Sequence, residues 1–86
     1  MASYKVELSR SAEKDLRRID RSMLPAIYQA IESLGEEPRP VGIKKMAGAD
    51  RTLRIRVGDY RIVYEIENDV LVVFVIRVAH RKDVYR

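Results

Sequence analysis

The sequence predicts an α+β fold: a small, antiparallel-dominated four-stranded sheet with a two-helix hairpin packed on one face. Three observations support this prediction. Residues 53–66 alternate apolar and polar side chains at the two-residue period of strands, and residues 70–78 form a further apolar run of strand length. Residues 12–34 repeat apolar side chains at helical spacing, and the proline-containing segment 36–42 separates the two patterns as a loop. A strand at 4–8 precedes the helices, so the predicted order is strand, helix, helix, strand, strand, strand.

Length and composition indicate one domain over residues 1–86. The chain is 47% hydrophobic and 35% charged. Its length is near the lower limit at which a hydrophobic core stabilises a fold without disulfides or bound metals. It has no cysteine, which excludes disulfides and thiolate metal sites, and we expect neither a metal nor a cofactor. The first residues, MASYKVELS, lack an apolar run of signal-peptide length, and no window approaches the roughly 20 apolar residues of a membrane span. We therefore expect a cytoplasmic protein that has no membrane partner.

The two predicted helices form a hairpin that needs a sheet to cover its apolar side. Ser9 or Ser11 can cap the first helix, residues 20–22 break the pattern, and Gly35 is predicted to end the second helix. The apolar positions are Ala12, Leu16 and Ile19 in the first helix and Leu24, Ile27, Ile31 and Leu34 in the second, where Pro25 is tolerated in the first turn. These stripes are predicted to pack on one face of the sheet.

The first hairpin of the sheet is predicted residue by residue. A two-residue turn with glycine first, Gly58-Asp59, suits the twist of an antiparallel pair. It places Val57 opposite Tyr60, Arg56 opposite Arg61 and Ile55 opposite Ile62. Directly opposed residues share a face, so one surface is apolar while Arg54, Arg56 and Arg61 collect on the other.

These arginines indicate a polyanionic partner. The formal net charge is +4, and residues 51–86 hold eight Lys or Arg against five Asp or Glu. Like charges directly opposite each other are destabilising by a few tenths up to about 1 kcal/mol. Such a pair makes most sense if an anion binds between the two side chains, although a solvated basic face is the simpler alternative for Arg54 and Arg56.

The last strand, 70–78, is apolar at both its odd and its even positions, which is typical of a strand covered on both faces. It is therefore predicted to lie in the middle of the sheet. If Asn68-Asp69 is a two-residue turn, Arg77 falls on the helix side or at its rim. The residues that would then share the face of Arg61 are Val72, Phe74, Ile76, Val78 and His80.

The order of elements and two segments together resemble a known family. The segments are R-I-R-V-G-D-Y-R-I-V-Y in the first hairpin and V-x-H-R-K-D-V-Y at the end. They are similar to the RelE branch of the RelE/ParE toxin superfamily. The resemblance implies the toxin of a type II toxin–antitoxin pair, an endoribonuclease that enters the 30S ribosomal A site and cuts the mRNA codon there. It also implies a cognate antitoxin that wraps the toxin, and it leaves open a heterotetramer built on an antitoxin dimer.

The resemblance assigns roles to individual residues. Arg54 and Arg56 match basic strand residues, which are usually lysines in that branch. Arg61 matches the arginine that holds the scissile phosphate, Arg81 the residue that protonates or steadies the leaving oxygen, and Tyr85 a tyrosine that orients or stacks on a base. Arg77 and Lys82 complete the candidate phosphate-binding set, in which Arg54, Arg56 and Arg61 are the central members.

Metal-free RNA cleavage needs a base on the 2′-OH, an acid on the leaving 5′ oxygen and charge stabilisation at phosphorus. Guanidinium groups bind phosphate well, but arginine, with a pKa above about 12, is a poor base, which weakens Arg56 in that role. His80 is the one histidine, and the ordinary pKa of a histidine, about 6.5, suits proton transfer. The alternatives are a strand-end His80 that bonds the backbone or the antitoxin, an Arg61–Glu65 ion pair, and Tyr85 as a packing anchor.

Two other functions compete with the ribonuclease. One is a ParE-like toxin that poisons DNA gyrase without cutting RNA, which shares the fold but ordinarily lacks the full set of basic residues with the tail tyrosine. The other is a catalytically inactive module that binds nucleic acid or the antitoxin, which the arginines in place of lysines favour. The cluster of basic residues, His80 and Tyr85 favours the ribonuclease.

Overall fold

The structure is a computed structural model that describes residues 3–40, 43–45 and 52–84. The chain order begins with β1 (Lys5–Leu8), α1 (Arg10–Arg18) and α2 (Leu24–Glu36). It continues with β2 (Lys44–Lys45), β3 (Thr52–Val57), β4 (Tyr60–Glu67), β5 (Val72–His80) and the single-turn α3 (Arg81–Val84). The predicted order of two helices between the first strand and the later strands is therefore confirmed.

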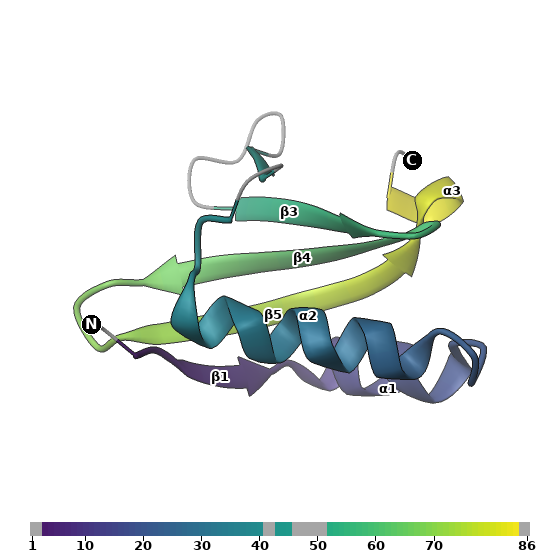
Figure 1. Ribbon diagram of the computed structural model, residues 1–86, viewed down its shortest axis with the longest axis horizontal. Helices are drawn as coiled ribbons and strands as arrows, with labels where there is room; N and C mark the ends of the chain where they lie inside the picture. Colours follow the sequence, from purple (N-terminus) through teal and green to yellow (C-terminus); the bar gives the residue numbers. More distant parts are fainter. Residues whose placement is uncertain (1–2, 41–42, 46–51, 85–86) are drawn as a thin grey trace.

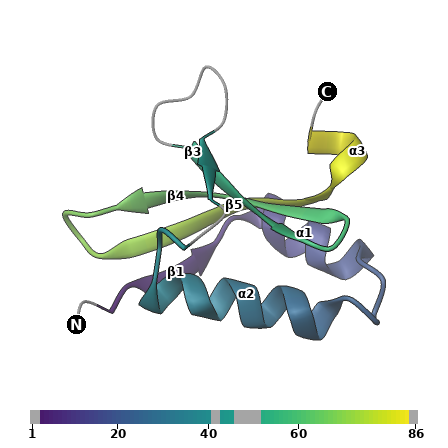
Figure 2. The same ribbon diagram turned by 45° about the horizontal axis from the view of Figure 1, so that its top comes forward.

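The strands form one mixed sheet in the order β1-β5-β4-β3-β2. β1 runs parallel to β5, and the other neighbouring pairs are antiparallel. Helices α1 and α2 cover one face, and α3 lies on the opposite side of the sheet from α2 (Figure 1, Figure 2). The four predicted strands are β1, β3, β4 and β5, and the two-residue β2 extends the sheet beyond β3. β4 is the central strand. β5 has a strand on both sides only from Val72 to Val75, so its predicted place in the middle of the sheet holds for its first half and is wrong for its second half.

The first turn of each helix follows from a local sequence feature, a side-chain cap in α1 and a proline in α2. Ser9 is the N-cap of α1, and its Oγ accepts a hydrogen bond from the Ala12 N–H at 3.0 Å. α2 has Pro25 in its first turn, where the missing N–H costs no intrahelical bond. Gly35 does not end α2, because the helix continues to Glu36. Gly35 serves close packing instead, since a Cβ there would lie 2.9 Å from the backbone oxygen of Tyr4.

The predicted β3–β4 hairpin is confirmed at every position. Val57 lies opposite Tyr60, and Arg56 lies opposite Arg61. Gly58 has a φ of +60°, the positive value that the first residue of this turn requires. Six apolar side chains of the two strands pack toward the core: Leu53, Ile55, Val57, Tyr60, Ile62 and Tyr64. The opposite face, called here the open face, carries Arg54, Arg56 and Arg61, together with Val63, Glu65 and Glu67.

The β4–β5 pairing corrects two predictions. The turn spans four residues, 68–71, and the pairing begins with Glu67 opposite Val72. The register then shifts at Val63 and Tyr64, where β5 carries an extra residue as a bulge. Val72 and Phe74 share the face of Arg61, as predicted. Beyond the bulge, the alternation of side chains between the two faces of β5 is shifted by one residue. Val78 and His80 therefore lie on the helix-covered side, contrary to the prediction.

The core lies between the helices and the centre of the sheet. Its members are Ala12, Leu16, Ile19, Ile27, Ile31, Leu34, Ile62, Tyr64, Ile66, Val73, Val75 and Val78. Every helical position predicted to be apolar belongs to this cluster or packs against it. The Tyr64 side chain is fully buried, and its hydroxyl donates to the Pro38 carbonyl at 2.6 Å. Burial raises the pKa of Tyr64 to about 12.

Candidate functional site

The centre of the candidate site is the cross-strand pair Arg56 and Arg61 on the open face. Their Cα atoms are directly opposed, because Gly58-Asp59 sets the register of the hairpin. Arg56 is exposed, and its Nε donates to the Gly58 carbonyl at 3.1 Å. Arg61 is half-buried, and its Nη1 donates to the Tyr60 carbonyl at 3.2 Å. Both guanidinium groups therefore contact backbone oxygens near the turn, which holds them at one end of the sheet.

The open face continues along β3 and β5. Arg54 precedes Arg56 by two residues and lies opposite Val63. Arg61 also lies opposite Ala79 on its other side. Val63 and Ala79 are both buried although they lie on the open face. The arginines therefore surround a small apolar surface, against which the planar, weakly hydrated guanidinium group can pack.

Arg81 is held at the same end of the sheet as this pair. It is the first residue of α3, and its backbone N–H donates to the Asp59 carbonyl in the β3–β4 turn at 2.7 Å. Figure 1 shows α3 beside that turn. Arg81 and Lys82 are exposed. The fold therefore brings Arg56, Arg61 and Arg81 together from three elements.

His80 lies on the helix-covered side rather than with the arginines. It is half-buried opposite Tyr60, and the two rings meet edge to face with centroids 5.5 Å apart. It lines a polar hollow of ≈ 200 Å³ between α1 and the end of β5. Its Nδ1 accepts from the Lys82 N–H at 3.3 Å, an arrangement in which the neutral ring carries its proton on Nε2. In this state the ring can donate from Nε2, but its acceptor nitrogen is already engaged.

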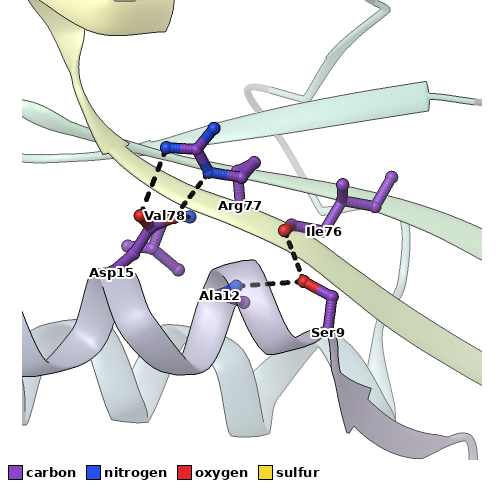
Figure 3. Close-up of polar contacts among 6 residues, drawn as sticks. All are labelled: Ser9, Ala12, Asp15, Ile76, Arg77 and Val78. Carbon is purple, nitrogen blue, oxygen red and sulfur yellow. Dashed lines mark hydrogen bonds and ion pairs between the residues drawn. The ribbon is translucent and has the colours of Figure 1, made fainter.

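Arg77 lies opposite Val63, on the open face, so its predicted position on the helix side is wrong. Its side chain turns to the outer edge of β5 and reaches α1, which is the rim position that was also predicted. Its Nε and Nη2 donate to Asp15 of α1 at 2.8 and 3.2 Å (Figure 3). This bidentate pair offsets the charge of Arg77 at the outer edge of β5, whereas Arg56 and Arg61 lie on strands farther across the sheet. The structure therefore sets Arg77 apart from the arginine pair.

Sequence reasoning missed Asp15, and one signal pointed to it. Asp15 lies three residues after Ala12 and four before Ile19, both buried, so it borders the buried stripe of α1 rather than the solvent face. Its side chain is only 13% exposed. Tyr85, the remaining predicted site residue, lies outside the described residues.

In residues 3–40, 43–45 and 52–84, no group of three or more His, Cys, Asp or Glu side chains is placed to hold a metal ion. Within the same ranges, no helix has the length and apolar character needed to cross a membrane.

Comparison with known proteins identifies the family. The family model for the ParE toxin of the type II toxin–antitoxin system parDE matches residues 6–85. The chain belongs to this family. The toxin is 33% identical over 84 residues to Toxin RelG of Mycobacterium tuberculosis, covering 96% of this chain and 97% of that protein. It is 34% identical over 85 residues to Toxin RelE3 of Methanocaldococcus jannaschii, covering 94% of each.

Solved structures agree with this placement in the RelE/ParE superfamily. The toxin matches a chain in the crystal structure of the toxin–antitoxin complex RelBE2 from Mycobacterium tuberculosis with a TM-score of 0.83 and 30% identity. The match covers 94% of each chain. The superfamily predicted from the sequence is therefore confirmed, and the protein is a type II toxin of the RelE/ParE superfamily.

Proposed function

We propose that the toxin is a ribosome-dependent endoribonuclease that cuts mRNA codons in the 30S A site. The observation that supports this most is the opposed pair Arg56 and Arg61, with Arg81 held to the same end of the sheet. Opposed like charges cost stability by themselves, up to about 1 kcal/mol, and a phosphate between them turns that cost into binding. RNA is a chain of such phosphates, so the open face suits it.

The proposed reaction needs no metal. The 2′-OH of the nucleotide before the cut loses its proton to water and attacks the adjacent phosphorus, and the 5′ oxygen of the next nucleotide leaves and takes a proton from water. The products are a 2′,3′-cyclic phosphate and a 5′-OH. Arg61, with Arg54 and Arg56, stabilises the negative charge on the phosphate oxygens by charge-assisted hydrogen bonds. Arg81 steadies the leaving oxygen, and Lys82 and Tyr85 are proposed to hold the neighbouring backbone and a base. Arg77 is proposed to add positive charge at the rim.

In this proposal His80 does not take the proton of the 2′-OH. His80 has its Nδ1 engaged by the Lys82 N–H and lies on the side of the sheet away from Arg61. We therefore propose that its main contribution is to position α3 and Arg81. In-line orientation of the RNA and charge stabilisation by the arginines would then supply most of the rate, since each effect is worth several kcal/mol.

A cognate antitoxin is proposed as the toxin's partner. The RelBE2 structure that it matches is of a toxin–antitoxin complex. We propose that the antitoxin covers the single domain over residues 1–86, in a heterodimer or in a heterotetramer built on an antitoxin dimer. Its target on the ribosome places the toxin in the cytoplasm.

The test is to map mRNA 5′ ends after brief induction of the toxin in cells. Cuts inside codons of translated messages are expected, and Arg61→Ala and Arg81→Ala are each expected to reduce them by ~10²-fold or more, the typical effect of removing one donor to a transition-state oxyanion. Lys5→Ala is the matched control, because Lys5 is an exposed cation on β1, at the far edge of the sheet. Variants of Arg61 and Arg81 that remain as active as the parent would contradict the site.

The family model that matches is that of a ParE toxin, which favours DNA gyrase poisoning as the second candidate function. This alternative predicts an SOS response with intact mRNA in the same cells. It also predicts that the parent, Arg61→Ala and Arg81→Ala all give the same mRNA 5′ ends, because the parent makes no cuts.

A further inference from the structure

Among the residues that the structure describes, none forms a strand beside the second half of β5 on its outer edge. β1 pairs with β5 only from Val72 to Val75, whereas β5 continues to His80. Ser9, the residue before α1, binds the backbone of β5 along this edge. The Ser9 N–H donates to the Val75 carbonyl at 2.9 Å, and the Ser9 hydroxyl donates to the Ile76 carbonyl at 2.6 Å (Figure 3).

Asp15 of α1 binds the next residues of β5 along this edge. Its Oδ2 accepts from the Val78 N–H at 2.9 Å and from Arg77 Nε at 2.8 Å, while its Oδ1 accepts from Arg77 Nη2 at 3.2 Å. One carboxylate thus binds the backbone of one residue and the side chain of the residue before it. Figure 3 shows Asp15 pointing from α1 at both of these groups.

These contacts fall where β5 changes register. Ile76 is the extra residue of the bulge, so Arg77 lies opposite Val63 and Val78 lies opposite Ile62 in the core. Without the bulge, every later residue of β5 would slip by one and change face. Arg77 would then lie opposite Ile62 under the helices, where it could not bind Asp15 from the rim.

We propose that Asp15 is a positioning residue for the site: it locks the bulged register of β5 and so sets where Arg81 lies relative to Arg61. The link is short, because Arg81 directly follows β5 and its N–H bonds to the Asp59 carbonyl in the turn that carries Arg56 and Arg61. A one-residue slip would move Arg81 along the strand direction by ~3.4 Å. The effect on cleavage rests on the proposed function, whereas the effect on register does not.

Four variants separate the parts of this interaction. Asp15→Ala removes both contacts, and Asp15→Asn keeps an oxygen for the Val78 N–H but loses the charge. Arg77→Met removes the ion pair and leaves the carboxylate on Val78. Glu13→Gln is the matched control, because Glu13 is an exposed acid on the same helix.

The first measurement is of register, by NMR of the folded toxin. Asp15→Ala is expected to lose the cross-strand contacts between Ile62 and Val78, and the Arg81 amide is expected to exchange with solvent ~10-fold faster or more, since exchange reports local opening. Asp15→Asn and Arg77→Met are expected to show smaller changes, and Glu13→Gln none.

The second measurement is of single-turnover cleavage on ribosomes that carry an mRNA codon in the A site, and of binding to ribosomes whose mRNA has a 2′-deoxy nucleotide at the cut. Asp15→Ala is expected to lower the rate by about 10²-fold, the cost of a displacement of ~1 Å at a reacting centre. The Kd is expected to stay within about threefold, because Arg54, Arg56 and Arg61 still bind the backbone. A folding defect alone would lower the active fraction in both assays together.

Each outcome decides the proposal. An Asp15→Ala variant that keeps the parent's register and Arg81 exchange overturns it, and so does one that loses the register but cleaves at the parent's rate. If Asp15→Ala does not fold, the same comparisons in Asp15→Asn and Arg77→Met decide. If the parent cuts no message, the proposed function fails, and the NMR result still supports or overturns the register lock.

Discussion

Arg56 and Arg61 lie directly opposite each other across the β3–β4 hairpin, on the face of the sheet that α1 and α2 do not cover. Their side chains reach back to the carbonyls of Gly58 and Tyr60, so both remain near the turn. The Arg81 N–H bonds to the same turn through Asp59. The turn therefore organises three cations, and its geometry should control both RNA binding and stability.

The salt dependence of RNA binding should show how many phosphates the arginines contact. Each phosphate contact on a single strand contributes about −0.7 to the slope of log K against log salt concentration. Arg56→Gln is expected to make that slope shallower by about 0.7 for an uncleavable RNA, measured by fluorescence anisotropy at several salt concentrations. Lys5→Gln, which changes an equal charge on β1, should leave the slope unchanged. An Arg56→Gln slope equal to that of the parent would mean that Arg56 does not touch phosphate.

The role of His80 can be separated into positioning and proton transfer. An asparagine at this position keeps an acceptor for the Lys82 N–H but cannot exchange a proton near neutral pH. His80→Asn is expected to cleave within about threefold of the parent's rate, whereas His80→Ala is expected to lose more. Single-turnover cleavage in a reconstituted translation reaction measures both rates. A tenfold or larger loss in His80→Asn would instead assign proton transfer to the imidazole.

Gly35 should be intolerant of any side chain. A Cβ there would lie 2.9 Å from the Tyr4 carbonyl oxygen, which belongs to the backbone at the start of β1. The Tyr4 N–H also donates to the Gly35 carbonyl at 2.7 Å, so the two segments cannot separate without losing that bond. Gly35→Ala is expected to lower the free energy of unfolding by about 1 to 3 kcal/mol in urea denaturation, despite the better helix propensity of alanine. Glu32→Ala, at an exposed position of α2, is the control and should have little effect.

Tyr64 should make stability fall at high pH. Burial raises its pKa in the folded state to about 12, above the ordinary value of 10, so the folded state keeps a proton that the unfolded chain loses between these pH values. Its contribution is therefore complete below pH ~10 and declines as pH rises toward 12, by at most about 1.4 kcal/mol per pH unit. Tyr64→Phe is expected to cost about 1 kcal/mol near neutral pH, because the Pro38 carbonyl loses its partner.

The comparison of the two proteins across pH isolates this effect from other titrating groups. The advantage of the parent over Tyr64→Phe in unfolding free energy should fall from pH 10 upward and reverse sign before pH 12, because the shift removes about 2 kcal/mol over that interval, more than the ~1 kcal/mol of the hydrogen bond. A constant difference over that interval would show that the phenol does not titrate differently on folding.

Local rules predicted the hairpin well because its register depends on a single short turn. Gly58-Asp59 and strict alternation fix each pair from Val57 and Tyr60 outward, and the structure confirms each one. The same holds for the helices, whose buried stripes follow from spacing alone. The placement of Arg54, Arg56 and Arg61 on one face was therefore predictable from the sequence.

The β4–β5 pairing could not be predicted in the same way. A four-residue turn includes Leu71 at φ 54°, a conformation that no glycine or asparagine at that position signals. The bulge at Ile76 is held from outside the strand by Ser9 and Asp15, which are over 60 residues away in sequence. Contacts of this kind depend on tertiary structure, and they decided the face on which His80 lies.

The parallel pairing of β1 with β5 has a consequence for how the toxin is made. β1 is among the first segments synthesised, yet its partner in the sheet follows every other strand in the chain. β1 must therefore stay unpaired until β5 has emerged from the ribosome, and long-range pairing of this sort slows folding. A nascent chain interrupted before β5 also lacks the segment that brings Arg81 to the hairpin. Such interrupted copies should therefore be harmless, and toxicity should begin only after β5 and Arg81 have been translated.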